Sequence, residues 1–219
     1  MPTRIALIHA VAVAMPPVAA AFAELWPEAE LVNLLDDSLS VDRGKHPALS
    51  PQMHRRITDL ADYAQRLGAD GILYTCSAFG EAIEAAARAS DRPVLKPNEA
   101  MFEAALAQGR RIGMIGTFAR SLPGMEQEFR DLARARGVDA SLTSICVPEA
   151  MPALQRGDRA THDALLADAA PRLEGSDAIM LAQFSTSVAA PSVQSRVAVP
   201  VLTSPESAVA KMKRLLGAT

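Results

Sequence analysis

Short apolar runs alternate along the whole chain with longer stretches in which apolar residues recur at helical spacing. Runs rich in Val, Ile and Leu that are bounded by Gly, Pro or Asp predict buried strands. Helical spacing is clearest over 52–67 and 159–173. The predicted strands are 5–9, 30–35, 71–75, 94–96, 112–116, 140–147, 178–182 and 201–203. This alternation predicts an α/β fold on parallel sheets.

The pattern repeats at an offset of 107 residues. Arg4-Ile5-Ala6-Leu7-Ile8 falls on Arg111-Ile112-Gly113-Met114-Ile115, and Pro93-Val94-Leu95 falls on Pro200-Val201-Leu202. The matches cluster where strands begin, which indicates an internal duplication. We therefore predict two pseudo-symmetric lobes, each a small parallel sheet flanked by helices.

The first lobe is predicted to span 1–97, with 205–219 packing back on it, and the second to span 98–204. Ligands of open parallel sheets bind beyond the carboxyl ends of the strands. In a two-lobe pseudodimer those ends can face one another, so an active site is expected in the cleft between the lobes. The segment 36–50 is the only long stretch without periodicity and is expected to be a lid or binding loop.

Composition narrows the class of protein. The chain has 219 residues and a net charge of −3, with no cluster of Lys or Arg that would predict nucleic-acid binding. No apolar run is long enough to span a bilayer. Arg4, the apolar stretch 5–15 and Ala21-Phe22-Ala23 resemble a weak secretory signal, but their repeat counterpart lies deep in the chain. A cytoplasmic protein without a membrane or nucleic-acid partner is expected.

Cys76 is the strongest candidate for chemistry. It follows a predicted buried strand and precedes a predicted helix, 78–89, between the hydroxyls of Thr75 and Ser77. A helix N-terminus lowers the pKa of a nearby thiol and favours the thiolate. The alternative is a small buried apolar residue, which is the ordinary fate of a free cysteine and the interpretation we favour for Cys146, within 142–147.

The remaining polar residues give weaker signals. His9 ends the first strand, where it either contacts substrate or is a satisfied structural histidine. The other histidines lack metal-ligand spacing, so no metal site is predicted. Gly113-Met114-Ile115-Gly116 lacks the third glycine of a dinucleotide fingerprint, so no cofactor is expected. Asp36 is interpreted as a loop cap, and a solvated helix face is expected to hold Arg55, Arg56, Asp59 and Asp62.

Several motifs resemble the aspartate/glutamate/hydantoin racemase superfamily, which also includes maleate isomerases and arylmalonate decarboxylases. They are Tyr74-Thr75-Cys76-Ser77-Ala78-Phe79, Ile115-Gly116-Thr117-Phe118-Ala119, Thr203-Ser204-Pro205-Glu206-Ser207-Ala208-Val209 and Asp36-Asp37-Ser38-Leu39. Together with the repeat, the resemblance covers nearly the whole chain. It implies chemistry without a cofactor at a carbon next to a carboxylate or acyl group of a small substrate.

The resemblance also implies two cysteines, one from each lobe, on opposite faces of the substrate carbon. Cys76 matches the first. Its repeat mate is Gln183, in Leu181-Ala182-Gln183-Phe184, where the second cysteine is expected. An amide exchanges no proton at neutral pH, so a symmetric two-thiol mechanism cannot operate.

Three mechanisms remain open. Cys76 serves one face while another group, such as Ser185 or Thr186, serves the other; or Cys76 adds to a double bond before rotation; or Cys76 protonates an enediolate formed by loss of CO2. A substrate pocket is expected to include Thr75, Ser77, Ala78, Thr117, Gln183, Ser185, Thr186 and His9. A non-enzymatic ligand-binding protein is the alternative of a different class, and the sequence leaves open whether the chain forms a homo-oligomer.

Overall fold

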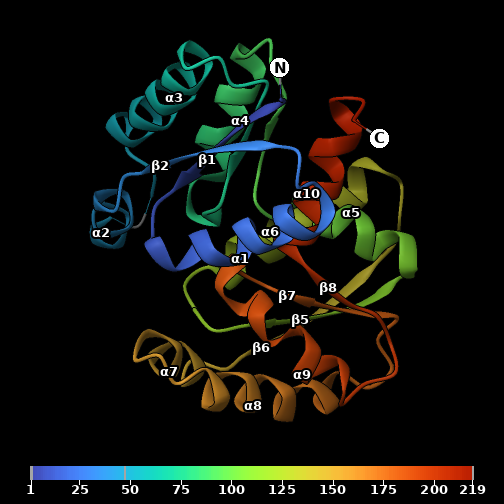
Figure 1. Cartoon of the computed structure of the whole chain (residues 1–219). Coiled ribbons are helices and arrows are strands. Elements are labelled where there is room, and N and C mark those ends of the chain that lie inside the picture. The colour runs from blue at the N-terminus through green and yellow to red at the C-terminus, as the bar shows by residue number, and fades with distance from the viewer. Residues whose placement is uncertain (1, 47, 219) are drawn as a thin grey trace. The chain divides into compact units, whose positions relative to one another are not determined.

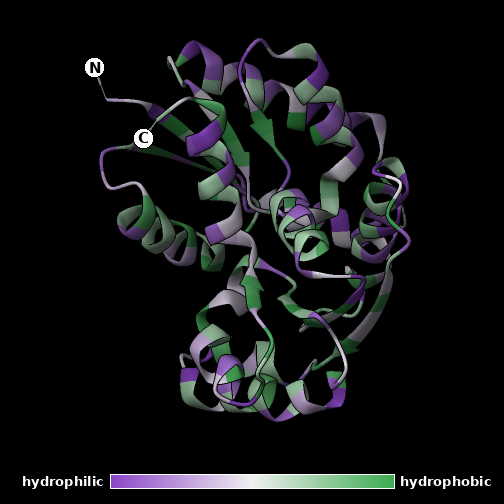
Figure 2. Cartoon of the chain, turned by 90° about the vertical axis from the view of Figure 1, so that its right-hand side faces the viewer, coloured by the Kyte–Doolittle hydropathy of each residue, from purple (hydrophilic) through white to green (hydrophobic). Residues whose placement is uncertain are grey.

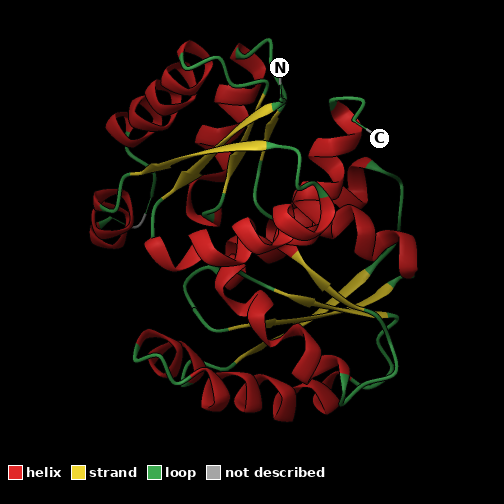
Figure 3. Ribbon diagram, in the orientation of Figure 1, coloured by secondary structure: helices red, strands yellow, loops and turns green. Residues whose placement is uncertain are grey.

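The computed structural model describes residues 2–46 and 48–218. The chain divides into two compact units, Met1–Pro97 with Ala208–Thr219, and Asn98–Ser207. Each unit contains one four-stranded parallel sheet with helices on both of its faces (Figure 3). The predicted α/β class, with a small parallel sheet in each of two pseudo-symmetric units, is confirmed.

The first unit is built on a sheet in the order β2-β1-β3-β4, of which β1 and β2 are labelled in Figure 1. Its strands are β1 (Arg4–His9), β2 (Glu30–Leu35), β3 (Gly71–Tyr74) and β4 (Val94–Leu95). Its helices are α1 (Met15–Leu25), α2 (Ser38–Lys45), α3 (Pro51–Arg66), α4 (Gly80–Ala89) and most of α10 (Ser204–Leu215).

Alternate residues of the buried strands face the two helical layers of this unit. Ile8 and Ile72 share a core with Ile57 of α3 and Ile83 of α4. On the other side α10 packs directly on β3, since a Cβ at Gly71 would lie 2.5 Å from the sulfur of a methionine on α10. β1 and β3 are buried along nearly their whole length, as expected for parallel strands that are covered on both faces, and green, hydrophobic strand segments are visible in Figure 2.

The second unit repeats this architecture with the order β6-β5-β7-β8. Its strands are β5 (Arg111–Gly116), β6 (Ser141–Cys146), β7 (Ala178–Leu181) and β8 (Val201–Thr203). Its helices are α5 (Glu99–Gln108), α6 (Leu122–Ala135), α7 (Ala150–Gln155), α8 (Arg159–Ala169) and α9 (Ala190–Gln194). Ile115 and Leu181 share a core with α8 and α9, whereas Met114 and Met180 face α5 and α6.

The two sheets also share their register. Ile5 pairs with Gly71 in the first sheet, and the residues 107 positions later, Ile112 and Ala178, pair in the second. Ile72–Val94 and Ile179–Val201 correspond in the same way. The turns that leave β3 and β7 therefore occupy equivalent places in the two units.

Three predicted elements differ from the structure. The segment 36–50 is not irregular throughout, because it contains the eight-residue helix α2. The helix after Cys76 starts at Gly80 rather than at residue 78, because a 3-10 turn, Ser77–Phe79, precedes it. The helix predicted over 159–173 ends at Ala169 and continues as a 3-10 turn, Ala170–Leu173, where Pro171 has no N–H to donate.

Among the described residues, no helix combines the length and apolarity that crossing a membrane requires.

Candidate functional site

Cys76 lies in the extended turn between β3 and the 3-10 turn, with φ −120° and ψ 122°. Its side chain is partly exposed and packs against the core that contains Tyr74 and Phe79. Burial raises the pKa of the thiol, while a hydrogen bond from the Ala78 backbone N–H and the positive charge of Arg43 lower it. The net shift is upward, so the predicted lowering is wrong: the sulfur is desolvated, and α4 begins only at Gly80.

His9 and Thr75 form a buried polar pair at the same end of the sheet. His9 is fully buried, and its Nδ1 lies 2.9 Å from the Thr75 hydroxyl oxygen. The other ring nitrogen, Nε2, lies 2.9 Å from Oδ1 of Asn33 on β2. Burial lowers the pKa of His9, although the Asn33 hydrogen bond opposes this. The neutral ring therefore donates to Asn33 and accepts the Thr75 hydroxyl, which fixes the residue that precedes Cys76.

Arg43 is a charged group at this turn that the sequence did not indicate. It belongs to α2, and its Nε donates a hydrogen bond of 3.2 Å to the carbonyl oxygen of Ala78. Ala78 and Ser77 are half-buried beside Cys76. The sequence of α2 has two apolar residues, of which Leu39 is buried and Val41 is exposed. The helix therefore had too short an apolar pattern to be predicted.

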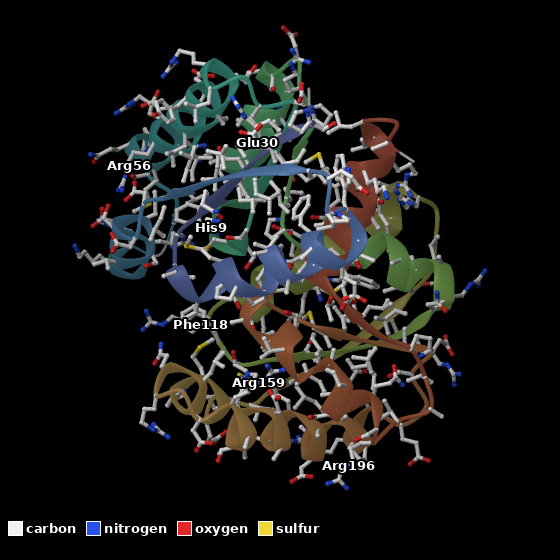
Figure 4. All side chains as sticks on the ribbon, viewed as in Figure 1. His9, Glu30, Arg56, Phe118, Arg159 and Arg196 are labelled. Carbon is white, nitrogen blue, oxygen red and sulfur yellow. The ribbon has the colours of Figure 1, made fainter. Side chains whose placement is uncertain are left out.

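Arg56 fixes the position of α2 from the neighbouring helix α3. Its guanidinium lies 2.6 Å from an oxygen of Asp36 and 2.8 Å from one of Asp42. Arg56 points from α3 towards α2 in Figure 4. The expectation that Arg56 belongs to a solvated face is wrong, whereas Arg55, Asp59 and Asp62 are exposed.

Partial burial opposes ionisation of Asp36, but hydrogen bonds from Ser38 and Arg56 lower its pKa. Asp36 is thus an ion-pair partner as well as a loop residue.

Gln183 occupies the equivalent turn of the second unit in a different conformation. Its φ of 119° makes it the one non-glycine residue with positive φ in the described chain. Its side-chain oxygen accepts a hydrogen bond of 3.0 Å from the Thr117 backbone N–H, and its side-chain nitrogen donates one of 2.8 Å to the Ser121 hydroxyl. The amide is therefore bound by its own unit, and a conformation that is costly for a residue with a Cβ is held in place.

The other candidates of the second unit surround Gln183. Thr117 is buried, and its hydroxyl lies 3.4 Å from the Gln183 side-chain oxygen. The Thr186 hydroxyl donates a hydrogen bond of 2.7 Å to the Gln183 carbonyl oxygen. Thr186 and Ser185 are both buried. Ser121 was not predicted, and only its position at the start of a helix after β5 could have suggested it.

Cys146 ends β6 and pairs with Gly116 in the ladder, so it lies at the carboxyl end of its sheet rather than in mid-strand. It is partly buried against the apolar core between this sheet and α6. Burial raises the pKa of its thiol, and the negative charge of Glu149 raises it further. These surroundings do not favour a thiolate.

The predicted residues thus form two sets, one in each unit. His9, Thr75, Cys76, Ser77 and Ala78 share the end of the first sheet, and the set of the second unit is Thr117, Gln183, Ser185 and Thr186. The first set contains a cysteine and a buried histidine, and Arg43 of α2 contacts its member Ala78. The second set is uncharged and hydrogen-bonded to itself. Across 2–46 and 48–218, no three His, Cys, Asp or Glu side chains are grouped as metal ligands.

Comparisons with known proteins place the chain in context. The family model described as Asp/Glu/Hydantoin racemase matches residues 11–212. Among solved structures, an allantoin racemase from Klebsiella pneumoniae has a TM-score of 0.73 at 18% identity, covering 99% of this chain and 89% of that one. A glutamate racemase isoform from Bacillus anthracis has a TM-score of 0.73 at 13% identity, covering 98% and 82%. The Gly74Cys mutant of arylmalonate decarboxylase has a TM-score of 0.69 at 20% identity, covering 98% and 93%. A search of curated protein sequences finds no match.

Proposed function

Because this chain belongs to the Asp/Glu/hydantoin racemase family, we propose that it is an isomerase that acts without a cofactor at a carbon next to a carboxylate or acyl group, with Cys76 as its reacting group. The family's racemases are isomerases. The substrate classes that fit are small α-amino acids, hydantoins and dicarboxylates. The observation that carries the proposal is the Cys76 turn, where a partly exposed thiol receives the Ala78 N–H and the charge of Arg43.

In this mechanism Cys76 exchanges one proton with the substrate carbon. As a thiolate it takes the α-proton: the C–H bond breaks, an S–H bond forms, and the electron pair moves onto the oxygens of the carboxylate or acyl group. If the neutral thiol returns a proton to the same face, the substrate is regenerated, so inversion of the carbon requires a second group that delivers a proton to the opposite face. Burial raises the pKa of the thiol, so a larger fraction of Cys76 is protonated, and able to supply a proton, than of an exposed cysteine at the same pH. His9 positions Thr75 and, with both ring nitrogens engaged, does not itself act as the base.

Gln183 is proposed to have no acid–base role. An amide neither gives nor takes a proton at neutral pH, and this one already binds Thr117 and Ser121. Chemistry that needs a proton on only one face of the carbon is therefore favoured over symmetric racemisation.

A decarboxylase with a single thiol is the second candidate, and the same observation favours it. Loss of CO2 leaves the electron pair of the broken C–C bond in an enediolate, and one S–H group is enough to protonate the carbon. Cis–trans isomerisation of a small dicarboxylate, in which the sulfur adds to the double bond and later leaves, likewise needs only one thiol.

The test is turnover by purified protein in D2O with α-amino acids, hydantoins, maleate and substituted malonates. The wild type should transform one class and leave deuterium at the reacting carbon of a racemised or decarboxylated product. The Cys76→Ser variant should do neither, whereas Cys146→Ser should behave like the wild type. Activity that survives in Cys76→Ser would refute the role of Cys76, and a wild type inactive on every class would refute the proposed function.

A further inference from the structure

The helix α2 is held in place by contacts that lie far from it in the sequence. Leu39 on its inner side is buried in the core of the first unit. Arg56 of α3 binds Asp42 within α2 and Asp36 just before it, at 2.8 and 2.6 Å. The Asp36 backbone N–H also donates to the His9 carbonyl oxygen at 3.0 Å. These contacts fix α2 beside the end of β1 (Figure 4).

Arg43 extends from this fixed helix to the turn that holds Cys76. Its Nε binds the Ala78 carbonyl oxygen at 3.2 Å, and its Nη1 binds the His46 carbonyl oxygen at 2.6 Å. Ala78 in turn gives its N–H to the sulfur of Cys76. Ala78 therefore accepts a hydrogen bond from the Arg43 guanidinium and donates one to the Cys76 sulfur, and it links the positive charge to the thiol.

We propose that Arg43 is a positioning residue for Cys76, which holds the cysteine turn through Ala78 and favours the thiolate with its charge, and that α2 anchored by Arg56 delivers it. The role as an aid to catalysis rests on the proposed function; the effect on the thiol does not. A guanidinium remains charged at every working pH, so its contribution is constant while the thiol titrates.

Arg43 matters because two opposing effects act on the pKa of the Cys76 thiol. Burial raises the pKa of the Cys76 thiol, and the Ala78 N–H and Arg43 oppose that rise. Without Arg43, only the Ala78 N–H would oppose the rise in the pKa that burial causes. The surrounding elements also carry other charged or titratable groups, among them Asp36, Asp37, Asp42, Lys45 and His46 at α2, Arg56 on α3, Glu81 and Glu84 on α4, Tyr74 on β3 and His9 on β1.

The experiment measures the alkylation rate of Cys76 by iodoacetamide against pH, in a Cys146→Ser background so that a single thiol reports. In Arg43→Gln the rate near neutral pH should fall roughly tenfold, the lower end of the effect of an opposite charge at short range. Arg43→Lys, which keeps the charge, should recover most of that loss. Arg55→Gln is the matched control, because it removes the same charge from an exposed position on α3. An alkylation profile of Arg43→Gln that matches Arg55→Gln would overturn the proposal.

Arg56→Gln provides a second test should Arg43→Gln fail to fold. It removes the anchor of α2 without touching Arg43, and it should lower the alkylation rate in the same direction; an unchanged rate would overturn the role of α2. Turnover separates the two proposals. A shifted alkylation profile in a protein without activity supports Arg43 and refutes the function. If the alkylation profile of Arg43→Gln is unshifted while the wild type is active and Cys76→Ser is inactive, the result refutes the role of Arg43 and supports the proposed function.

Discussion

The turns that leave β3 and β7 are equivalent in backbone topology and opposite in chemistry. Each follows the strand that pairs with the first strand of its unit in the same register. In the first unit the turn presents Cys76 in an ordinary extended conformation. In the second it presents Gln183 at φ 119°, with both ends of the amide bonded inside the unit. The repeated scaffold thus preserves the position without preserving the residue type or its backbone conformation.

The two turns also differ in what surrounds them. At the first turn Arg43 of α2 binds the carbonyl oxygen of Ala78, two residues after Cys76, whereas in the second unit Arg159 of α8 binds that of Val188, five residues after Gln183. The second set satisfies its own hydrogen bonds through Thr117, Ser121 and Thr186. We infer that the first turn is arranged to change protonation state and that the second is arranged to stay fixed.

The largest effect should come from replacing Cys76, the proposed reacting group of the first turn. Cys76→Ala should lower kcat by at least about 10²-fold, the low end of what one positioned acid–base group contributes. Folding should be preserved, because Cys76 as a whole residue is only partly buried and the change removes a single atom. Circular dichroism and turnover on the same preparation check this prediction. An active Cys76→Ala variant, or a Cys146→Ser variant that is equally inactive, would contradict the assignment of Cys76 as the reacting thiol.

The second prediction tries to make the two turns alike. Gln183→Cys supplies a thiol at the position where the family resemblance implies one, so racemisation of an α-acidic substrate should rise by up to about 10²-fold. The same change removes the partner of the Thr117 N–H and should cost about 1–3 kcal/mol of stability. Chiral chromatography and denaturant unfolding measure the two effects.

Gln183→Ser is the matched control for that variant. It loses the same hydrogen bonds but provides no group that titrates near neutral pH. It should share the loss of stability and show no gain in racemisation. An equal gain in both variants would mean that loosening the turn, rather than the thiol, is responsible.

Much of this comparison was accessible from sequence because buried parallel strands are read directly from continuous apolar runs. The offset of 107 residues then aligned the strand exits and selected Cys76 and Gln183. The register of Ile5 with Gly71 and of Ile112 with Ala178 follows the same offset. Local pattern and global fold agree in these segments, as expected where burial dominates.

The electrostatics of the site could not be read in the same way. The anchors of α2 join Arg56 to Asp36 and Asp42, which are 20 and 14 residues away in the chain. No short-range pattern encodes such pairs. The direction in which the pKa of Cys76 shifts depends on desolvation by the core as well as on where the helix begins. The strained conformation of Gln183 depends on contacts with two other segments of the chain.

The third prediction concerns His9, the buried histidine that contacts Thr75 in the first turn. Burial holds the pKa of His9 below 6.5, although the Asn33 hydrogen bond opposes it. Below pH 6.5 the unfolded chain therefore binds a proton that the folded chain does not, and stability falls as the pH drops from 6.5 towards the folded pKa. His9→Gln removes this term. Chemical denaturation at about pH 7.5 and about pH 5.5 should show a smaller loss in the variant than in the wild type. An equal loss in both would contradict a depressed pKa.

The smallest effect should appear at the opposite ends of the strands, where the repeats carry Asp70 and Asp177. The Arg111 guanidinium lies 2.7 Å from Asp177, and the backbone N–H groups of Arg110 and Arg111 both donate to it at 2.9 Å. These contacts lower the pKa of Asp177 to about 2. Asp70 instead accepts the backbone N–H of Arg4 at 2.9 Å, while the Arg4 side chain pairs with Glu30.

A carboxylate with a lowered pKa stabilises the fold above its ordinary value of 3.8, and that contribution is lost as the pH falls through about 2. At neutral pH, Asp177→Asn should therefore lower the melting temperature more than Asp70→Asn does. Both changes should be small, because Arg111 is exposed and solvent screens its charge. Added salt should narrow the difference, since it weakens the one ion pair that distinguishes the two sites. An Asp70→Asn variant that melts at or below the temperature of Asp177→Asn would show that the backbone hydrogen bonds, which both sites have, matter more than the arginine.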